Sequence, residues 1–257
     1  MKKSIDMIHC VGDSHANFFS GFDIMQPEWP SPGIQNRYPF FRSYRIGPAL
    51  AYNLCDNHTT TKGWERLMGL LEVIPKGSFI LFCFGEIDCR AHILLQAKKL
   101  SRPIEEVVFN VVKRYFSIIN EIQSKGYHPI VWGVAPSAPS DVNSKIVVPP
   151  QFLFHGSRSE RNHVTRKFNE QCCKMAKEGG VFFINLFDSL INPDQTPKRE
   201  YFVDEIHLSQ KAMPMAIDEI NNGLGTCFDQ DPPDRISLIE DNVYFSETVD
   251  PGFLFPN

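Results

Sequence analysis

The sequence has no long apolar run and no excess of positive charge. None of its segments approaches the roughly 18 uncharged apolar residues that a transmembrane helix requires. Asp6 interrupts the stretch after Lys2 and Lys3, so we expect no signal peptide. The formal net charge of -4 over 257 residues offers no basic patch of the kind that binds a nucleic-acid backbone. These absences argue against a membrane span and against a nucleic-acid partner.

The cysteines lack a recognisable pattern as well. There are seven, an odd number, and none forms a C-x-x-C pair. This argues against a complete disulfide framework and against a zinc site. The sequence therefore predicts reduced thiols and a cytoplasmic protein. The cysteines are Cys10, Cys55, Cys83, Cys89, Cys172, Cys173 and Cys227.

The composition is typical of one globular domain. With 42% hydrophobic and 22% charged residues, the chain can bury one sizeable core. We expect that domain to span residues 1–225. Residues 226–257 contain four prolines but also five aromatic residues, which is more than a disordered tail usually carries. This extension is expected either to pack on the domain or to bind a partner.

Short apolar runs alternate with segments of helical periodicity. Several of the short runs are apolar almost throughout, which is typical of parallel strands covered on both faces. The alternation predicts an α/β protein with a three-layer α/β/α, flavodoxin-like, doubly wound sheet of five parallel strands. The predicted strands are residues 5–11, 42–46, 78–84, 128–134 and 181–186, and the predicted helices lie near 48–55, 62–72, 89–99, 104–122, 159–178 and 208–223.

One predicted connection is longer than ordinary loops. Residues 136–157 follow the carboxyl end of a predicted strand and contain four prolines. Because ligands of open α/β sheets bind outside the carboxyl ends of the strands, we expect this loop to line or cover a site.

A serine follows the first predicted strand directly, in the run Gly12-Asp13-Ser14. A serine hydroxyl needs an adjacent base, usually an imidazole that a carboxylate orients. Asp204 and His207, shortly before the last predicted helix, supply both groups. Each residue also has a structural interpretation, because Asp13 or Asp204 can cap a helix and His207 can lie on the surface. Together they favour a serine hydrolase.

Four sequence blocks resemble those of the SGNH (GDSL-type) hydrolases. Gly12-Asp13-Ser14-His15 resembles their Gly-Asp-Ser block and Asp204-Glu205-Ile206-His207 their Asp-x-x-His block. The resemblance implies that Ser14 is the nucleophile, that His207 is the general base and acid, and that Asp204 orients the imidazole. It implies a three-layer α/β/α fold and no metal or cofactor. Gly47 is similar in position to the block-two glycine, so the N–H groups of Ser14 and Gly47 would face the oxyanion.

The remaining block departs from the family pattern. Gly85-Glu86-Ile87-Asp88 stands where the family has Gly-x-Asn-Asp, and Ile87 cannot donate the hydrogen bond of the asparagine. Losing one such donor typically lowers kcat by about 10²–10³. Either Arg90 or Asn53 replaces it, or the oxyanion hole is weakened. Asp13, Gly85, Glu86, Asp88 and Arg90 form a candidate substrate-binding or supporting set, although an ion pair closing the strand–helix turn is an equally good interpretation of the charged members.

The blocks together predict an ester hydrolase that acts on a small acyl ester, such as an O-acetyl group on a carbohydrate. Two alternatives stay open at this point. The acyl group can pass to a sugar hydroxyl in place of water, or the fold can bind glycans or partner proteins without turnover. His15, beside the nucleophile, is expected either to touch the substrate or to have a capping or packing role. The sequence does not predict the oligomeric state.

Overall fold

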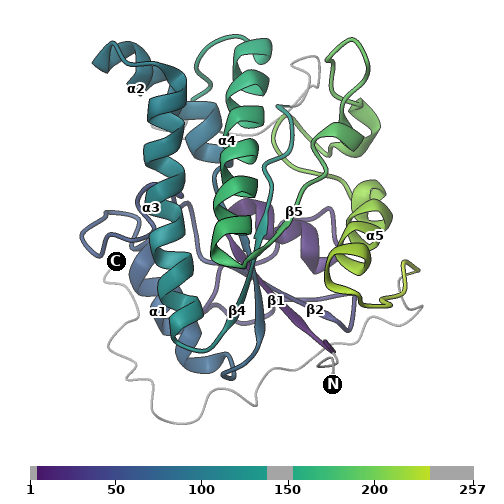
Figure 1. Cartoon of the computed structure of the whole chain (residues 1–257). Helices are drawn as coiled ribbons and strands as arrows, with labels where there is room; N and C mark the ends of the chain where they lie inside the picture. Colours follow the sequence, from purple (N-terminus) through teal and green to yellow (C-terminus); the bar gives the residue numbers. More distant parts are fainter. Residues whose placement is uncertain (1–4, 138–152, 232–257) are drawn as a thin grey trace.

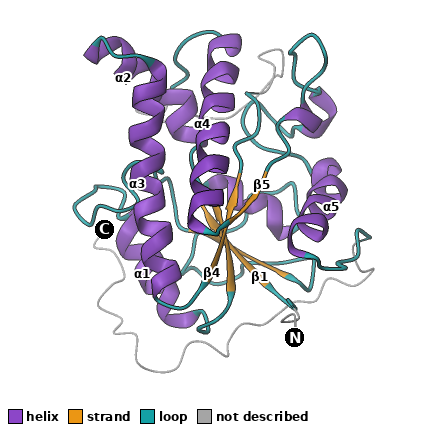
Figure 2. Ribbon diagram, in the orientation of Figure 1, coloured by secondary structure: helices purple, strands orange, loops and turns teal. Residues whose placement is uncertain are grey.

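The structure is a computed structural model that describes residues 5–137 and 153–231. Its centre is a sheet of five parallel strands in the order β2-β1-β3-β4-β5 (Figures 1 and 2). The predicted five-stranded α/β fold is thus confirmed. The strands are β1 (Ile8–Gly12), β2 (Phe41–Arg45), β3 (Phe79–Cys83), β4 (His128–Trp132) and β5 (Phe182–Ile184).

Helices cover both faces of the sheet. Figure 1 shows α1 to α4 gathered on one side and α5 on the other. The α-helices are α1 (Gly63–Val73), α2 (Ile93–Leu100), α3 (Ile104–Ser124), α4 (Arg158–Gly179) and α5 (Met213–Leu224). Shorter helical segments are η1 (Ser14–Ser20), η2 (Asp88–His92), η4 (Asp188–Leu190), η5 (Arg199–Tyr201) and η6 (Gln210–Ala212).

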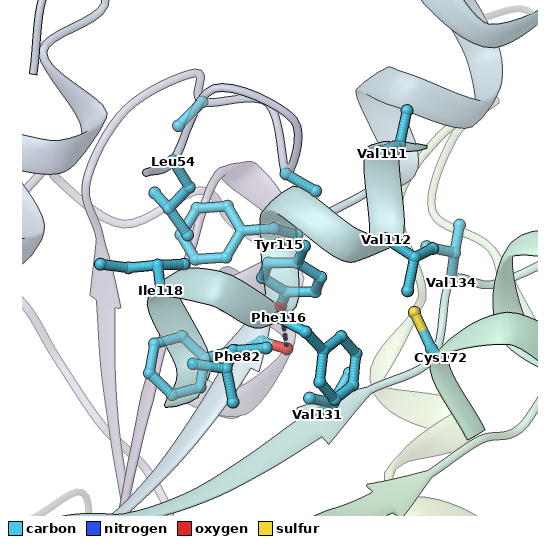
Figure 3. Close-up of a cluster of buried hydrophobic side chains, with 14 of the residues drawn as sticks. Leu54, Phe82, Val111, Val112, Tyr115, Phe116, Ile118, Val131, Val134 and Cys172 are labelled. Atoms are coloured by element: carbon cyan, nitrogen blue, oxygen red, sulfur yellow. Dashed lines mark hydrogen bonds between the residues drawn. The ribbon is translucent and has the colours of Figure 1, made fainter. Parts of the chain in front are cut away.

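Alternation along the strands divides the buried side chains into two cores. On β3, Ile80 and Phe82 belong to the core formed with α1, α3 and α4, whereas Leu81 and Cys83 belong to the core formed with η1 and α5. Figure 3 shows part of the first core, where the Tyr115 hydroxyl donates a hydrogen bond to the Phe82 carbonyl oxygen. The central strand β3 is apolar throughout because both of its faces are covered, whereas β2, at the edge of the sheet, contains Arg42, Ser43 and Arg45.

Three local predictions differ from the structure. The predicted helix near 48–55 is wrong, since residues 51–55 form turns. The helix predicted at 89–99 is divided into the π-helical turn η2 and then α2. Residues 14–20 form the 3-10 helix η1, which ends at the left-handed Gly21; it was not among the predicted helices, although the capping interpretation of Asp13 implies a helix there. At 51–55 the turns are held by Asp88 from a distant segment, which accepts hydrogen bonds from the N–H groups of Ala51 and Tyr52.

The strand order places the predicted site at a reversal of the chain path. From β1 the chain passes to β2 on one side and then to β3 on the other, and a crevice forms at the carboxyl ends of such strands. Gly12 ends β1 against Cys83 of β3, and a Cβ atom at position 12 would lie 2.4 Å from the Cys83 carbonyl oxygen. Glycine at this position therefore permits the close approach of the two strands.

The described part of the predicted extension lies against the domain. The ring of Phe228 stacks on Phe40 with 4.3 Å between centroids, and the Asn221 side chain bonds both the N–H and the carbonyl oxygen of Phe228. Residues 232–257 lie outside the described residues, so the boundary between 1–225 and 226–257 stays a prediction. In the described ranges, no helix is both long enough and apolar enough to cross a bilayer.

Candidate active site

Ser14 stands at the point where β1 becomes η1. Asp13 is fully buried and caps η1, because its Oδ1 accepts a hydrogen bond of 2.9 Å from the His15 N–H. The capping interpretation of Asp13 is therefore correct, and it is compatible with a functional Ser14. Burial raises the pKa of Asp13, although the nearby His15 opposes the shift. The cap holds Ser14 at the carboxyl end of the sheet.

Asp204 and His207 lie on the tight loop between η5 and η6. The Oδ1 atom of Asp204 accepts hydrogen bonds of 2.7 Å from the N–H groups of both Ile206 and His207. An antiparallel bridge between Phe202 and Leu208 closes the loop. Two N–H groups of the loop backbone thus hold the Asp204 carboxylate in place, independently of its contact with the His207 imidazole.

Ser14, His207 and Asp204 form a continuous hydrogen-bonded chain. His207 Nε2 lies 2.8 Å from Ser14 Oγ, and His207 Nδ1 lies 2.8 Å from Asp204 Oδ2. Burial opposes the charge on Asp204, but its hydrogen bonds with His207 keep its pKa below the usual value. Asp204 is therefore an ionised acceptor, which favours the tautomer of His207 with the proton on Nδ1. The Nε2 atom is then able to accept a proton from Ser14.

Ser14, His207 and Asp204 line a cavity of about 410 Å³. One part of its wall is apolar and comes from η1, the end of β4 and the residues around His207. The polar part contains Ser14, His207 and Asp204 together with His15 and Glu86. The lining residues are Ser14, His15, Asn17, Phe18, Asp23, Met25, Cys83, Phe84, Glu86, Trp132, Gly133, Val134, Ala135, Val203, Asp204, His207 and Leu208.

His15 connects the cavity to a buried ionic cluster. Its ring lies 5.1 Å from that of His207, measured between centroids, and its Nε2 atom lies 3.4 Å from Glu86 Oε2. Burial disfavours the charged form of His15, but the carboxylates of Asp13 and Glu86 outweigh it and raise the pKa of His15. His15 therefore lines the cavity and also packs against His207.

Arg90 fixes the position and the charge of Glu86. Its Nε donates a hydrogen bond of 2.6 Å to Glu86 Oε1, and both side chains are mostly buried. Burial opposes the charge on Glu86, but Arg90 and His15 lower the pKa of Glu86 to about 2. The Arg90 guanidinium in turn lies over the ring of Phe154, with Arg161 also in contact with that ring. Glu86 faces the cavity, while Arg90 lies behind it.

Asp88 and Ile87 have structural positions away from the cavity. Asp88 accepts hydrogen bonds from the N–H groups of Ala51 at 2.7 Å and Tyr52 at 3.2 Å. Burial raises the pKa of Asp88 to about 7 in spite of these donors. The Ile87 side chain is 5% exposed and packs against Ala91 and Leu50.

The two residues suggested as replacements for the missing amide donor do not line the cavity as the described residues define it. Arg90 is engaged with Glu86, and Asn53 lies in the turn after Leu50, where its N–H donates to the Leu50 carbonyl oxygen.

The two predicted block glycines are required by the backbone. Gly47 follows β2 with a φ of +83°, and a Cβ atom there would lie 2.2 Å from Arg66 Nη1. Gly85 has a φ of +112°, and its Cβ atom would lie 2.5 Å from the ring of Phe168. Both positions therefore favour glycine. Neither belongs to the described set of cavity-lining residues, and the oxyanion role of Gly47 stays a prediction.

Sequence reasoning missed several residues of the site. Asn17 and Phe18 line the cavity from η1, and Asp23 lines it from the segment after η1. Trp132 lines it from the end of β4. The spacing of Asn17 and Phe18 from Ser14 by about one helical turn was an available signal, but it required a helix at 14–20 to be recognised first.

The predicted loop 136–157 lies largely outside the described residues, since 138–152 are not described. Of its described parts, Pro136 and Ser137 border a small second cavity beside Arg90 and Arg161. The N–H of His155 donates to the Arg90 carbonyl oxygen at 3.0 Å. A role of residues 138–152 in covering the main cavity stays a prediction.

Comparisons with known proteins give matches to structures alone. Neither protein-family models nor curated protein sequences match the chain. A catalytic mutant of Axe2, an acetylxylan esterase from Geobacillus stearothermophilus, superimposes with a TM-score of 0.52 at 12% identity, over 91% of this chain and 100% of that chain. A member of the lipolytic protein G-D-S-L family from Veillonella parvula has a TM-score of 0.50 at 17% identity, over 84% and 96%.

The chain has the fold of the GDSL-type hydrolases. The family resemblance expected from the four sequence blocks is thereby confirmed at the level of the fold. In this fold, the first and last sequence blocks are 193 residues apart but come into contact through Ser14 and His207. At the predicted third block, Glu86 lines the cavity, whereas Ile87 packs away from it against Ala91 and Leu50.

Proposed function

We propose that this protein is a serine ester hydrolase of the SGNH (GDSL) type that cleaves small acyl esters. The observation that carries the proposal is the chain of 2.8 Å contacts from Asp204 through His207 to Ser14, which ends in a cavity. An imidazole oriented by a carboxylate is the group that a serine hydroxyl needs to become a nucleophile.

In the first step, Ser14 Oγ attacks the carbonyl carbon of the ester. His207 Nε2 accepts the hydroxyl proton as the new C–O bond forms, and Asp204 stabilises the resulting imidazolium. The tetrahedral intermediate then collapses, and His207 returns the proton to the departing alcohol oxygen. The product of this step is an ester between the acyl group and Ser14.

In the second step, water replaces the alcohol. His207 removes a proton from the water, the acyl group leaves Ser14 as a carboxylic acid, and the Ser14 hydroxyl is restored. We assign the stabilisation of the oxyanion to the N–H groups of Ser14 and Gly47, in line with the family resemblance. None of these steps requires a cofactor.

The size and lining of the cavity are suitable for the acyl group of a small ester. Its volume of about 410 Å³ lies near the lower end for small-molecule sites, and Phe18, Trp132 and Val134 form an apolar part of its wall. An O-acetyl group on a carbohydrate is our proposed substrate class. The structural similarity to an acetylxylan esterase is consistent with it.

The open alternatives differ in how the site would behave. Transfer of the acyl group to a sugar hydroxyl uses the same acyl-enzyme and requires only that an alcohol replaces water. A binding protein without turnover does not require the hydrogen-bonded chain of Ser14, His207 and Asp204, so this geometry favours a catalytic role.

The test is labelling with a fluorophosphonate together with hydrolysis of para-nitrophenyl acetate. We expect Ser14→Ala to lose both activities while it stays folded. Ser117→Ala, on the exposed face of α3, is the matched control and should retain both. Fluorophosphonate labelling that persists in Ser14→Ala would overturn the assignment of the nucleophile.

A further inference from the structure

The peptide unit between Ile46 and Gly47 is bonded to a side chain at its carbonyl end. Arg66, on α1, donates a hydrogen bond of 2.8 Å from its Nη1 atom to the Ile46 carbonyl oxygen. The other end of this peptide unit is the N–H of Gly47, a buried residue, and it donates to no acceptor within residues 5–137 and 153–231. Buried N–H groups normally have a partner. The Gly47 N–H is therefore a donor that is available to a bound group.

Arg66 determines where this N–H points. The N–H of a trans peptide points opposite to its C=O, so a side chain that holds the Ile46 carbonyl oxygen also directs the Gly47 N–H away from itself. The N–H of Ile46 donates to the Gly12 carbonyl oxygen at 2.9 Å, which keeps the end of β2 beside the end of β1. Ser14 follows Gly12 by two residues. The donor is thus fixed next to the strand end that presents the nucleophile.

The same contact explains why position 47 holds a glycine. A Cβ atom there would lie 2.2 Å from Arg66 Nη1 and 3.1 Å from Glu28 Oε2. Any larger residue would therefore displace the guanidinium from the Ile46 carbonyl oxygen. Glycine at this position serves the approach of a cation to the backbone, in addition to the positive φ of the turn.

A carboxylate holds Arg66 in this place. Glu28 Oε2 lies 3.2 Å from Arg66 Nη1, and Glu28 Oε1 lies 3.6 Å from Arg45 Nη2. The segment of Glu28 is itself attached to β2, because the Trp29 N–H donates to the Arg45 carbonyl oxygen at 2.7 Å. The Arg66 side chain is 25% exposed. Its contact with the peptide is therefore supported by a network of charges and backbone bonds.

We infer that Arg66 is a positioning residue of the oxyanion hole, which orients and polarises the peptide whose N–H, that of Gly47, stabilises the oxyanion. A cation bonded to a carbonyl oxygen draws electron density towards it, so the N–H of the same peptide becomes a stronger donor. Arg66 does not line the cavity as the described residues define it, so it acts through the peptide alone. The inference rests on the proposed ester hydrolysis and on the role proposed there for Gly47.

The test is Arg66→Met, which nearly keeps the length of the side chain but removes the charge and the donor. Stopped-flow measurements with para-nitrophenyl acetate separate the affinity for the ester from the rate constants of acylation and deacylation. Both steps pass through an oxyanion, so we expect both rate constants to fall by about tenfold while the affinity stays within about twofold of wild type. This loss is smaller than the roughly 10²–10³ expected when a whole donor is removed.

The outcomes distinguish this inference from the proposed function. A folded Arg66→Met with wild-type rate constants would overturn the inference and leave the proposed function intact. Absence of acylation in the wild-type protein would overturn the proposed function, and the inference with it. If Arg66→Met does not fold, Arg66→Gln decides the matter, since it also removes the charge. It should lower acylation by at least about threefold, and a wild-type rate would contradict the inference.

Arg114→Met is the matched control. Arg114, on α3, is a half-buried arginine that also donates to a backbone carbonyl oxygen of a distant segment, that of Tyr52, at 2.7 Å. Because this peptide has no part in the proposed oxyanion hole, the control should keep the wild-type rate constants. An equal loss of acylation in Arg114→Met would contradict a role specific to Arg66.

Discussion

Ser14 and His15 are adjacent residues, yet each faces a different pair of acidic and basic side chains. Ser14 contacts His207, which in turn contacts Asp204 three residues earlier on the same loop. His15 contacts Glu86, which in turn contacts Arg90 four residues later in the segment that follows β3. The first arrangement consists of aligned 2.8 Å contacts, whereas the second is dominated by a buried ion pair.

The first group of side chains is suited to proton transfer, whereas the second carries a fixed charge. A proton can pass between Ser14 and His207 because the two atoms lie at hydrogen-bond distance and the imidazole is held by a carboxylate. Glu86 has a pKa of about 2 because Arg90 and His15 outweigh the cost of its burial, so it does not exchange protons near neutral pH. The Glu86 cluster therefore carries fixed charge, whereas the Ser14–His207 contact is the one that transfers a proton in the proposed mechanism.

The largest effect is expected from Asp204→Asn. An amide at this position no longer stabilises the imidazolium and can favour the wrong tautomer of His207, so kcat should fall by roughly 10⁴ with little change in folding. Asp23→Asn, which alters another carboxylate of the cavity wall, should lose far less. Steady-state kinetics with para-nitrophenyl acetate provides the measurement. A kcat of Asp204→Asn within tenfold of wild type would remove the distinction between the two clusters.

Glu86→Leu should affect stability more than the chemical step. It removes the carboxylate 2.6 Å from the buried Arg90, and loss of one partner of a buried ion pair typically costs about 3–5 kcal/mol. The double variant Glu86→Leu with Arg90→Leu should recover part of that loss. Glu106→Leu, from an exposed pair with Arg102, is the control and should cost no more than about 1 kcal/mol. Urea unfolding that gives equal losses for Glu86→Leu and Glu106→Leu would contradict the role assigned to the buried pair.

Asp88, which also lies in the segment after β3, should make the stability of the protein depend on pH. Burial raises its pKa from 3.8 to about 7, so between these pH values the folded protein binds more protons than the unfolded chain. The contribution of Asp88 to the free energy of unfolding should therefore fall as pH rises from 4 to 7, by up to about 4 kcal/mol. In Asp88→Asn this part of the slope should disappear. The measurement is urea unfolding at several pH values, and parallel profiles of the two proteins would show that Asp88 does not titrate in this range.

The fold and the Ser14–His207–Asp204 geometry were accessible from the sequence for a physical reason. Fully buried parallel strands need apolar residues throughout, and a strand that ends in Gly-Asp-Ser indicates a serine at the edge of the sheet. Asp204 and His207 are close in sequence, so a single loop presents both. These features depend on local patterns that a sequence displays directly.

The remainder of the site depends on contacts that no local pattern shows. The helix predicted at 48–55 is absent, since Asp88, from a distant segment, holds the N–H groups of Ala51 and Tyr52 in a turn. The position of Glu86 is determined by Arg90 and by His15, which comes from another strand end. Ile87 is a further example. Its place in the Gly85–Asp88 block indicated a position facing the oxyanion, but its side chain packs against Ala91 and Leu50.

Ile87→Asn tests whether an amide at this position can add a donor to the proposed oxyanion hole. If position 87 faced the oxyanion, the new amide would speed acylation of Ser14 by as much as about 10²-fold. Because Ile87 is 5% exposed and packs against Ala91 and Leu50, we expect a different result. The amide should be buried without a partner and lower the free energy of unfolding by about 1–3 kcal/mol. The acylation rate, followed by stopped-flow with para-nitrophenyl acetate, should not increase.

Ile87→Val, which keeps the position apolar, is the control and should cost about 0.5–1.5 kcal/mol. A faster acylation in Ile87→Asn would contradict the packed position of Ile87 and show that position 87 reaches the oxyanion.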